Sequence, residues 1–273
     1  MDWSEVAVVV PARLESSRLP HKLLQPVAGH PVLSWTLHAL KQLPLPPDHL
    51  AVATGDPAIQ DLAERSGVRV VSTPQELPSG THRVAVASAH LPPAVRWVMN
   101  VQGDEPLIDP ATVEAVWSAR GPSSDLLTAA CPITAEEWLD PHTVKAIVDA
   151  RGKALWFTRA PEPFRLRELP RAALESALAQ LPQIHRHLGI YGFRRDRLEQ
   201  WLDLPDCPLA HTAALEQLAA LSAGWTIQVA KVPRPRGPSV DTAADLDAVR
   251  AILSTCPSES GPGSPSSTAL VSP

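Results

Sequence analysis

Cysteine, lysine, tyrosine and long apolar runs are all scarce in this chain of 273 residues. The three cysteines, Cys131, Cys207 and Cys256, are odd in number and far apart, which argues against a disulfide framework and a zinc knuckle. The longest strongly apolar run, Val6 to Val10, is much shorter than the roughly 20 residues of a membrane span. Because the first residues are acidic, we expect no signal peptide and a soluble, cytoplasmic protein without membrane contacts.

Positive charge is also in deficit. The 24 Lys and Arg residues face 29 Asp and Glu residues, so the formal net charge is −5 and the isoelectric point is near 6.0. A dedicated nucleic-acid binder would show a basic balance, and we therefore expect no nucleic-acid partner. Proline, with 30 residues, is about twice as frequent as usual, but such a bias carries no functional information by itself.

Apolar segments of two alternating kinds fill the first half of the chain. Continuous β-branched or apolar runs predict strands, and apolar residues three or four apart predict helices. The strands are expected at 6–10, 50–54, 68–71 and 95–101, and the helices at 31–43, before Gly67, at 81–89 and at 110–119. Repeated units of this kind predict an α/β fold with a mainly parallel sheet and helices on both faces.

The middle of the chain departs from this alternation. Strands are expected at 126–133, 144–149, 154–158 and 189–193, with a helix at 172–181, which together predict a smaller mixed α/β subdomain inserted at about 130–190. The main frame then continues with a helix at 212–223, a strand at 226–232 and a last helix near Asp241. We therefore expect one domain over 1–255 and a disordered Ser, Pro and Gly tail over 256–273.

A basic loop follows the first predicted strand. Arg13, Arg18 and Lys22 are spaced over ten residues with two serines between them, and ligands of open α/β sheets bind beyond the carboxyl ends of strands. Arginine and lysine at such a place suit a polyphosphate. The chain lacks both the P-loop pattern and the Gly-x-Gly-x-x-Gly pattern, which argues against a P-loop ATPase and dinucleotide binding. On charge alone, a solvated basic loop is an equally good interpretation.

Two aspartates are candidate metal ligands. Asp104 ends the fourth predicted strand beside Gly103, and Asp241 precedes the last predicted helix. Mg²⁺ prefers one or two carboxylates together with phosphate oxygens and water, so an acidic strand end beside a basic loop suits a metal–triphosphate complex. The alternatives are that Asp104 caps the next element and that Asp241 is a helix N-cap, with Asp245 in the first turn.

Taken together, the segments resemble the 3-deoxy-D-manno-octulosonate (Kdo) cytidylyltransferases, the CMP-Kdo synthetase family. The resemblance runs in order over nearly the whole chain except the tail. Its most specific segments are NVQGDEPLI (100–108) and RHLGIYGF (186–193). The others include VVVPARLESSRLPHK (8–22), SGTHRVA (79–85), KAIVDARGKALWFTRAPEPF (145–164), LEQL (215–218) and VDTAADL (240–246).

This resemblance implies a Rossmann-like, GT-A-like nucleotidyltransferase fold and the reaction of CTP with Kdo to CMP-Kdo and diphosphate, which activates the sugar for lipopolysaccharide biosynthesis. It also implies Mg²⁺ as cofactor and a homodimer formed through the inserted subdomain. The implied nucleotide contacts are Arg13, Arg18, Lys22, Ser79 and Gly80, and the implied Mg²⁺ ligands are Asp104 and Asp241. The implied sugar-acid contacts are Gln102, Arg159, His187, Tyr191, Glu216 and Gln217.

Four positions depart from the family pattern. His21 stands where a glycine is usual, His82 where an aspartate is usual, and His30 and Val86 replace a common Lys and Glu. The loss of a carboxylate at position 82 predicts a weaker orientation of Arg83. Two other functions therefore stay open, namely the same reaction on another sugar acid (8-amino-Kdo or a sialic-type acid) and a catalytically silent nucleotide-binding protein.

Overall fold

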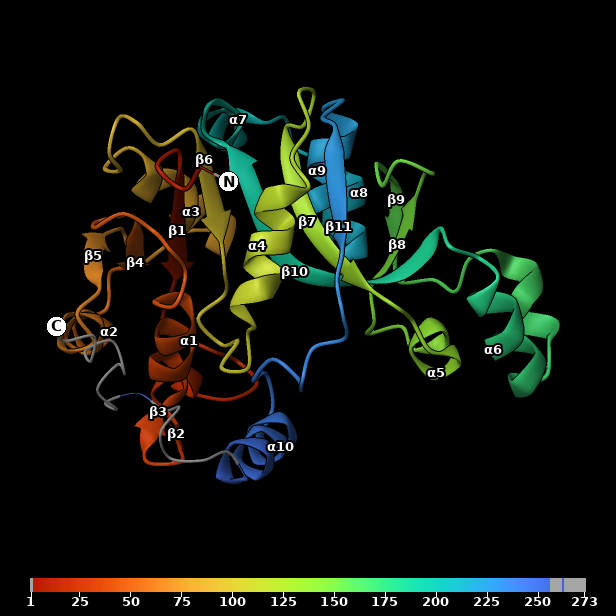
Figure 1. The fold of residues 1–273 in the computed structure, drawn as a ribbon, viewed down its shortest axis with the longest axis horizontal. Coiled ribbons are helices and arrows are strands. Elements are labelled where there is room, and N and C mark those ends of the chain that lie inside the picture. The colour runs from red at the N-terminus through yellow and green to blue at the C-terminus, as the bar shows by residue number, and fades with distance from the viewer. Residues whose placement is uncertain (1, 256–261, 263–273) are drawn as a thin grey trace, which may run out of the picture.

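A computed structural model of the chain describes residues 2–255 and 262 (Figure 1). The tail expected at 256–273 lies outside this range except for Pro262. Within 2–255, nine strands form one sheet in the order β11-β7-β10-β6-β1-β4-β5, and β8 and β9 extend it from β10. The strands are β1 (Val6–Pro11), β4 (Leu50–Thr54), β5 (Arg69–Ser72), β6 (Trp97–Asn100), β7 (Leu126–Cys131), β8 (Lys145–Val148), β9 (Ala154–Thr158), β10 (Ile184–Arg194) and β11 (Ile227–Lys231), and a separate hairpin consists of β2 (Pro26–Val27) and β3 (His30–Pro31).

The central part of the sheet is parallel, as predicted. Strand β1 lies between β4 and β6 and is parallel to both, β5 is parallel to β4, and β11 is parallel to β7. Strand β10 enters this frame antiparallel to β6, β7 and β8, and β9 completes an antiparallel hairpin with β8. The carboxyl ends of β1 and β6 therefore lie side by side, which brings the loops that follow them together.

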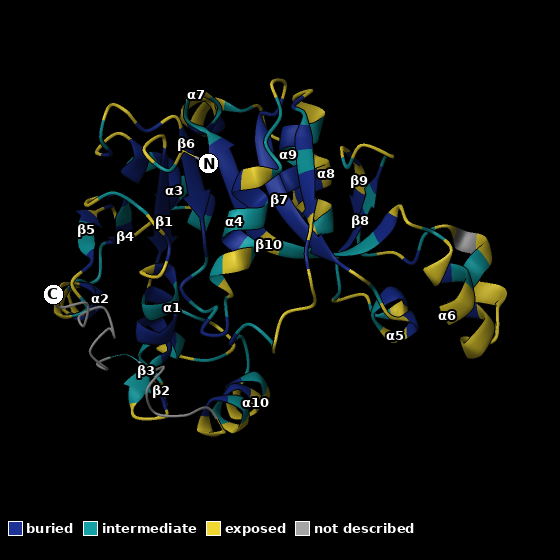
Figure 2. Cartoon of the chain, in the orientation of Figure 1, coloured by how far each residue is buried: buried dark blue, intermediate teal, exposed yellow. Residues whose placement is uncertain are grey.

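Helices cover both faces of the sheet. One face packs against α1 (Val32–Leu40), α2 (Pro57–Arg65) and α4 (Pro110–Ser118), and the other against α3 (Gly80–Ser88), α7 (Arg195–Gln200), α8 (Pro208–Ala213) and α9 (Gln217–Ser222). Successive β1 residues point to opposite faces, so Val8 joins the first core and Val9 the second, and both are fully buried. Figure 2 colours strand β1 as buried. Each such valine stabilises the fold by about 1.5–3 kcal/mol, which explains the uninterrupted apolar run.

An arm projects from the main body at the right of Figure 1. It contains α5 (Ala135–Leu139) and α6 (Arg171–Ala179), whereas the β8–β9 hairpin between them in sequence packs on the main core through Ala146 and Phe157. Trp138 of α5 and Leu174 and Leu178 of α6 form its small separate core. The Glu137 carboxylate fastens α5 to the body, because it accepts hydrogen bonds from Arg186 of β10 and from Arg234 after β11.

The segment 212–223 differs from the single helix predicted for it. It forms α8 and α9, separated by Ala214 in the left-handed conformation with φ of 51°. The side chain of Arg159 donates to the carbonyls of Ala213 and Ala214, so these acceptors serve a tertiary contact instead of a continuing helix. Apolar periodicity alone does not reveal such a competition.

The C-terminal helix α10 (Ala243–Ser254) packs against the β2–β3 hairpin from the opposite end of the sequence (Figure 1). Val27 and Trp35 share a buried core there with Leu246 and Val249. Short 3-10 turns, η1 (Lys22–Leu24), η2 (Phe164–Glu168) and η3 (Trp201–Asp203), complete the fold. None of the helices in the described part of the chain is both long and apolar enough to cross a membrane.

Candidate active site

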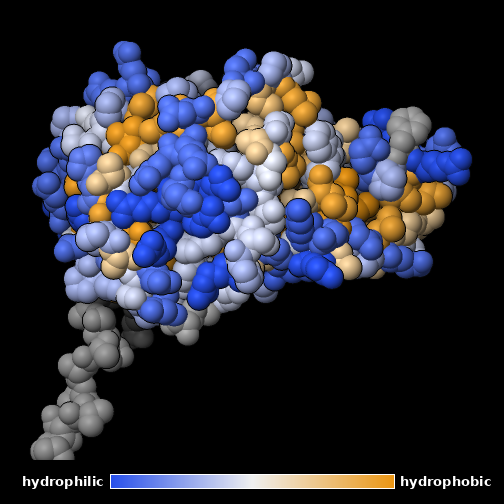
Figure 3. All heavy atoms as spheres, turned by 90° about the horizontal axis from the view of Figure 1, so that it is seen from above, coloured by the Kyte–Doolittle hydropathy of each residue, from blue (hydrophilic) through white to orange (hydrophobic). Residues whose placement is uncertain are grey.

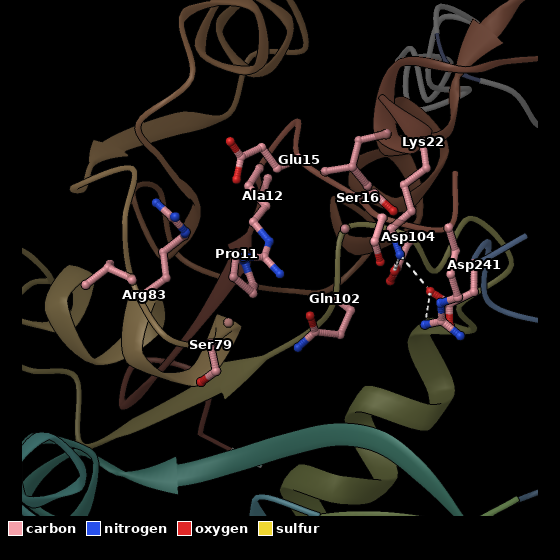
Figure 4. A pocket seen from close by; sticks show the side chains of 17 residues that line it. Pro11, Ala12, Glu15, Ser16, Lys22, Ser79, Arg83, Gln102, Asp104 and Asp241 are labelled. Atoms are coloured by element: carbon pink, nitrogen blue, oxygen red, sulfur yellow. Dashed lines mark hydrogen bonds and ion pairs between the residues drawn. The ribbon is translucent and has the colours of Figure 1, made fainter. Parts of the chain in front are cut away.

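The loops after β1 and β6 border a cavity of about 220 Å³, here called the first cavity (Figure 4). It includes every residue that the sequence predicted for the nucleotide and the metal, together with Gln102, and its predicted members are Arg13, Arg18, Lys22, Ser79, Gly80, Gln102, Asp104 and Asp241. These residues come from four separate parts of the sequence. The parallel pairing of β1 with β6 and the return of the C-terminal segment bring them together.

Asp104 and Asp241 converge on one cation. The Lys22 ammonium donates to Asp104 Oδ2 and, at 2.8 Å, to Asp241 Oδ1, and Arg18 lies 3.1 Å from the same Asp241 oxygen (Figure 4). Burial alone would lower the pKa of Lys22, but the two carboxylates raise it above its ordinary value. Lys22 therefore stays positively charged between two carboxylates.

Other residues perform the capping that was the alternative role for these aspartates. Helix α4 is capped by Asp109, which accepts from the Ala111 N–H, and α10 is capped by Thr242, whose hydroxyl accepts from the Asp245 N–H. Asp104 and Asp241 are therefore left to face the cavity. Two carboxylates that already share one cation suit a small divalent ion such as Mg²⁺, which takes one or two carboxylates plus phosphate oxygens. Residues 2–255 and 262 contain no group of three or more His, Cys, Asp or Glu side chains that could hold a metal ion.

Gly80 and Arg83 of α3 form one wall of the first cavity. A Cβ on Gly80 would lie 3.3 Å from both Gln102 Oε1 and Pro11 Cγ, so a side chain there would crowd the cavity. Arg83 donates to the Thr73 hydroxyl at 2.6 Å and to two backbone carbonyls at 2.8 Å. These partners hold Arg83 without a contribution from residue 82, so the weaker orientation expected from His82 stays a prediction.

The two histidine departures differ in their surroundings. His21 has φ of 53° and lies in the left-handed region, where a glycine is unstrained, and it lies outside the first cavity. His82 Nδ1 lies 2.9 Å from the Ser79 hydroxyl, so this side chain is bonded to a residue of the first cavity. Burial lowers the pKa of His82.

A second cavity of about 320 Å³ lies where β10 passes α9. It contains all but one of the predicted sugar-acid contacts, namely Arg159, His187, Tyr191, Glu216 and Gln217. The remaining one, Gln102, lies in the first cavity. The pairing of β10 with β7 is irregular between Leu188 and Tyr191, and this bulge bends the strand at the cavity.

Burial shifts the pKa values of several groups in the second cavity. Burial lowers the pKa of His187 to about 3, so the imidazole is neutral, with Nε2 2.9 Å from the Thr128 hydroxyl. Burial raises the pKa of Tyr191 well above its usual value, and its hydroxyl donates to Gln217 Oε1 at 3.3 Å. Burial also raises the pKa of Glu216, although the hydroxyls of Thr81 and Ser79 donate to it and oppose the rise. The cavity therefore suits a ligand with several hydroxyl groups.

A hydrogen-bond chain joins the two cavities. Gln102 donates to Asn100 at 3.0 Å, Asn100 to the Thr81 hydroxyl at 3.2 Å, and Thr81 to Glu216 at 2.8 Å. Asn100 and Thr81 are fully buried and were not predicted as functional residues. In the sequence, only their positions within the motifs at 100–108 and 79–85 pointed to these two residues. Thr128, Lys145 and Arg186 beside the second cavity were also missed.

The sequence was compared with known proteins. A family model described as cytidylyltransferase matches residues 7–228. The 3-deoxy-manno-octulosonate cytidylyltransferase of Anaeromyxobacter sp. (strain Fw109-5) is 39% identical over 93% of this chain and 99% of its own length. That of Rhodospirillum centenum (strain ATCC 51521 / SW) is 41% identical over 90% of this chain and 92% of its own.

Two solved structures are similar to the chain. A CMP:2-keto-3-deoxy-manno-octonic acid synthetase complexed with CTP superposes with a TM-score of 0.81 at 33% identity, over 92% of this chain and 98% of that one. A cytidylyltransferase from Leptospira borgpetersenii superposes with a TM-score of 0.59 at 15% identity, which supports the fold alone. By sequence and fold, the chain belongs to the cytidylyltransferase family, among the 3-deoxy-manno-octulosonate cytidylyltransferases.

Proposed function

We propose that the chain transfers CMP from CTP to the anomeric hydroxyl of Kdo and releases diphosphate. The observation that carries this proposal is the hydrogen-bond chain from Gln102 to Glu216, which joins a cationic cavity to a hydroxyl-binding one. A nucleotide in the first cavity and a sugar acid in the second would meet along this chain. The names of the similar proteins support CTP and Kdo as the substrates.

The first cavity suits a nucleoside triphosphate. Arg13, Arg18 and Lys22 supply three cations, and a guanidinium can hold two phosphate oxygens in a fork. Ser79 caps α3, so Gly80 and the first N–H groups of this helix lie beside the same cavity. We assign Ser79 and Gly80 to the cytosine end of CTP.

Mg²⁺ fits the carboxylate pair of Asp104 and Asp241, because both already direct oxygens at the Lys22 cation. When bound, Mg²⁺ neutralises charge on the triphosphate oxygens. Lys22 then remains as a mobile donor that can turn from the aspartates to a phosphate oxygen.

The second cavity suits a carboxylated sugar. Arg159 and Arg186 are cations that line it together with Glu216, and Glu216 can accept hydrogen bonds from sugar hydroxyls. Neutral His187, Tyr191 and Gln217 offer further polar contacts. The anomeric oxygen forms a bond to the α-phosphorus as the bond to diphosphate breaks, and the hydroxyl proton passes to water. Positioning and electrostatics suffice for this step, so no protein nucleophile is needed.

Release of diphosphate from CTP tests the proposal. The full chain is incubated with CTP, Mg²⁺ and either Kdo, 8-amino-Kdo, a sialic acid or no acceptor. We expect release with Kdo and none without acceptor. Turnover with only another acid would reject Kdo as the substrate, and CTP binding without release for every acid would reject an enzymatic role.

We also propose that the inserted segment of about 130–190 forms a homodimer interface and that the protein works in the cytoplasm, where nucleoside triphosphates are made. Figure 3 shows hydrophobic residues gathered between the main body and the projecting arm. On β9, Leu155 is 57% exposed and Trp156 is 40% exposed. Large apolar side chains exposed together on one element are typical of contact surfaces.

A further inference from the structure

Lys145, the first residue of β8, is completely buried, although lysine is rarely so. Its ammonium donates to the backbone carbonyls of Asp140 at 2.6 Å and of Thr143 and Arg159 at 2.9 Å. These three bonds use its three donors. The Asp140 carboxylate instead accepts from the His142 N–H and the Thr143 hydroxyl.

Arg159 follows β9 and is held in the same manner. Its Nε donates to the Ala213 carbonyl at 3.1 Å, Nη1 to the His142 carbonyl at 2.9 Å and Nη2 to the Ala214 carbonyl at 3.2 Å. A guanidinium has five donors, so two N–H groups remain. Among the residues that the structure describes, neither Lys145 nor Arg159 has a carboxylate within 4.0 Å of its charged nitrogens.

The two cations form one arrangement, in which Arg159 lines the second cavity and the buried Lys145 contacts it from within the protein. Lys145 holds the carbonyl of Arg159 itself and also the 140–143 loop, and His142 of that loop in turn holds the Arg159 guanidinium. Lys145 thereby fixes both the backbone and one side-chain partner of Arg159. Burial lowers the pKa of Lys145; the charge of the Asp140 carboxylate opposes this change, and the charge of Arg159 adds to it. Neighbouring cations without an ion-pair partner are costly unless an anion joins them.

We propose that Lys145 is a positioning residue for the carboxylate of the sugar acid: it fixes Arg159 in the second cavity and adds a second positive charge behind it. This inference rests on the proposed function, because it takes a sugar carboxylate as the anion. Arg159 makes the contact, and Lys145 acts through it. The ammonium supplies three donors to three carbonyls and also a positive charge, and the test separates these two contributions.

The test compares Lys145→Met and Lys145→Gln with the full wild-type chain. The glutamine variant keeps an N–H donor without the charge. Lys231→Met is the matched control, because Lys231 is a strand lysine of β11 whose ammonium donates to the Pro182 carbonyl at an exposed site. Diphosphate release gives KM for Kdo and KM for CTP separately. Inhibition of the same reaction by the C1 amide of Kdo, compared with KM for Kdo, reports how strongly the enzyme prefers the charged carboxylate.

We expect both Lys145 variants to raise KM for Kdo at least tenfold and KM for CTP less than twofold, and to lose most of the preference for the acid over its amide. Lys231→Met should behave like the wild type. Equal changes in both KM values, or an unchanged acid preference, would overturn the inference and leave Lys145 a purely structural residue. If the methionine variant does not fold, the glutamine variant decides alone. Absence of wild-type turnover with Kdo would instead reject the proposed function; if another acid is used, the same variants are tested with it and its amide.

Discussion

At the scale of single residues, the carboxylate pair explains most about the reaction. Asp104 and Asp241 hold Lys22 and cap no helix, so their conformations serve the first cavity alone. We predict that Asp104→Ala lowers Mg²⁺-dependent diphosphate release at least a hundredfold, while the circular dichroism spectrum stays that of the wild type. Lys22 keeps Asp241 as partner in this variant, so folding does not depend on Asp104.

Asp109→Ala is the matched control for this variant. It removes a carboxylate five residues away that caps α4. Asp109 lines neither the first nor the second cavity. We expect a loss of about 1 kcal/mol in the free energy of unfolding and no loss of turnover. Near-normal activity of Asp104→Ala under saturating Mg²⁺ would show that Asp104 is not a metal ligand.

His187 links the second cavity to stability at low pH. Its pKa is about 3 in the folded chain and about 6.5 in an unfolded one, so unfolding takes up a proton between these values. This contribution is fully present above pH 6.5 and is lost as the pH falls toward 3. It amounts to about 2 kcal/mol between pH 7 and pH 5.

We therefore predict that His187→Gln reduces the loss of stability between pH 7 and pH 5 by about 2 kcal/mol. Urea unfolding at both pH values measures this difference, and His90→Gln, at an exposed position, controls for the substitution itself. The same loss in His187→Gln as in the wild type would mean that His187 is not the buried neutral group described above.

At the scale of elements, the break between α8 and α9 positions Glu216 and Gln217. Ala214 makes this break with φ of 51°, a conformation that costs an L-residue about 1–2 kcal/mol. We predict that Ala214→Gly raises the free energy of unfolding by about 0.5 kcal/mol, after subtraction of the entropy that glycine loses on folding. Urea unfolding measures the change.

Ala213→Gly provides a control of opposite sign, because Ala213 is the last residue of α8. It should lower stability by about 0.5–1 kcal/mol. If both glycine variants destabilise the chain equally, the left-handed conformation at Ala214 does not govern the stability of this turn.

The elements also show what the sequence could predict. Strand β9 was predicted at its observed bounds and β1 to within one residue, because each is an apolar run ended by a turn or a proline. Helices α5 and α7 have five and six residues, too few for a clear apolar period, and were not predicted. The break at Ala214 depends on Arg159, 55 residues earlier in the chain, which no local pattern reports.

At the scale of the whole molecule, the exposed apolar residues of β9 suit a contact between two copies of the chain. We predict that Leu155→Glu with Trp156→Glu converts a dimer into a monomer in sedimentation experiments at micromolar concentration, because two charges would be buried at the β9 surface. Leu202→Glu, at a site of 45% exposure in η3 outside the arm, is the control and should leave the dimer intact. A monomeric wild type would reject the proposed interface.

Some residues of the assembled site could be predicted from the sequence and others could not. The motifs predicted the residues of the first cavity, since the loops after parallel strands meet at one sheet edge. The chain from Asn100 through Thr81 to Glu216 crosses 135 residues of sequence at its last bond, and its members look like ordinary polar residues of a strand and a helix. Only their burial together identifies them.

The position of Asp241 has a consequence for biosynthesis. This carboxylate lies between β11 and α10 in the sequence. Helix α10 packs on the β2–β3 hairpin, which is synthesised more than 200 residues earlier. A nascent chain that still holds residue 241 inside the ribosome therefore has the basic loop and Asp104 but only half of the carboxylate pair. The first cavity therefore gains its second carboxylate only after residue 241 has left the ribosome, later than every other predicted residue of this cavity.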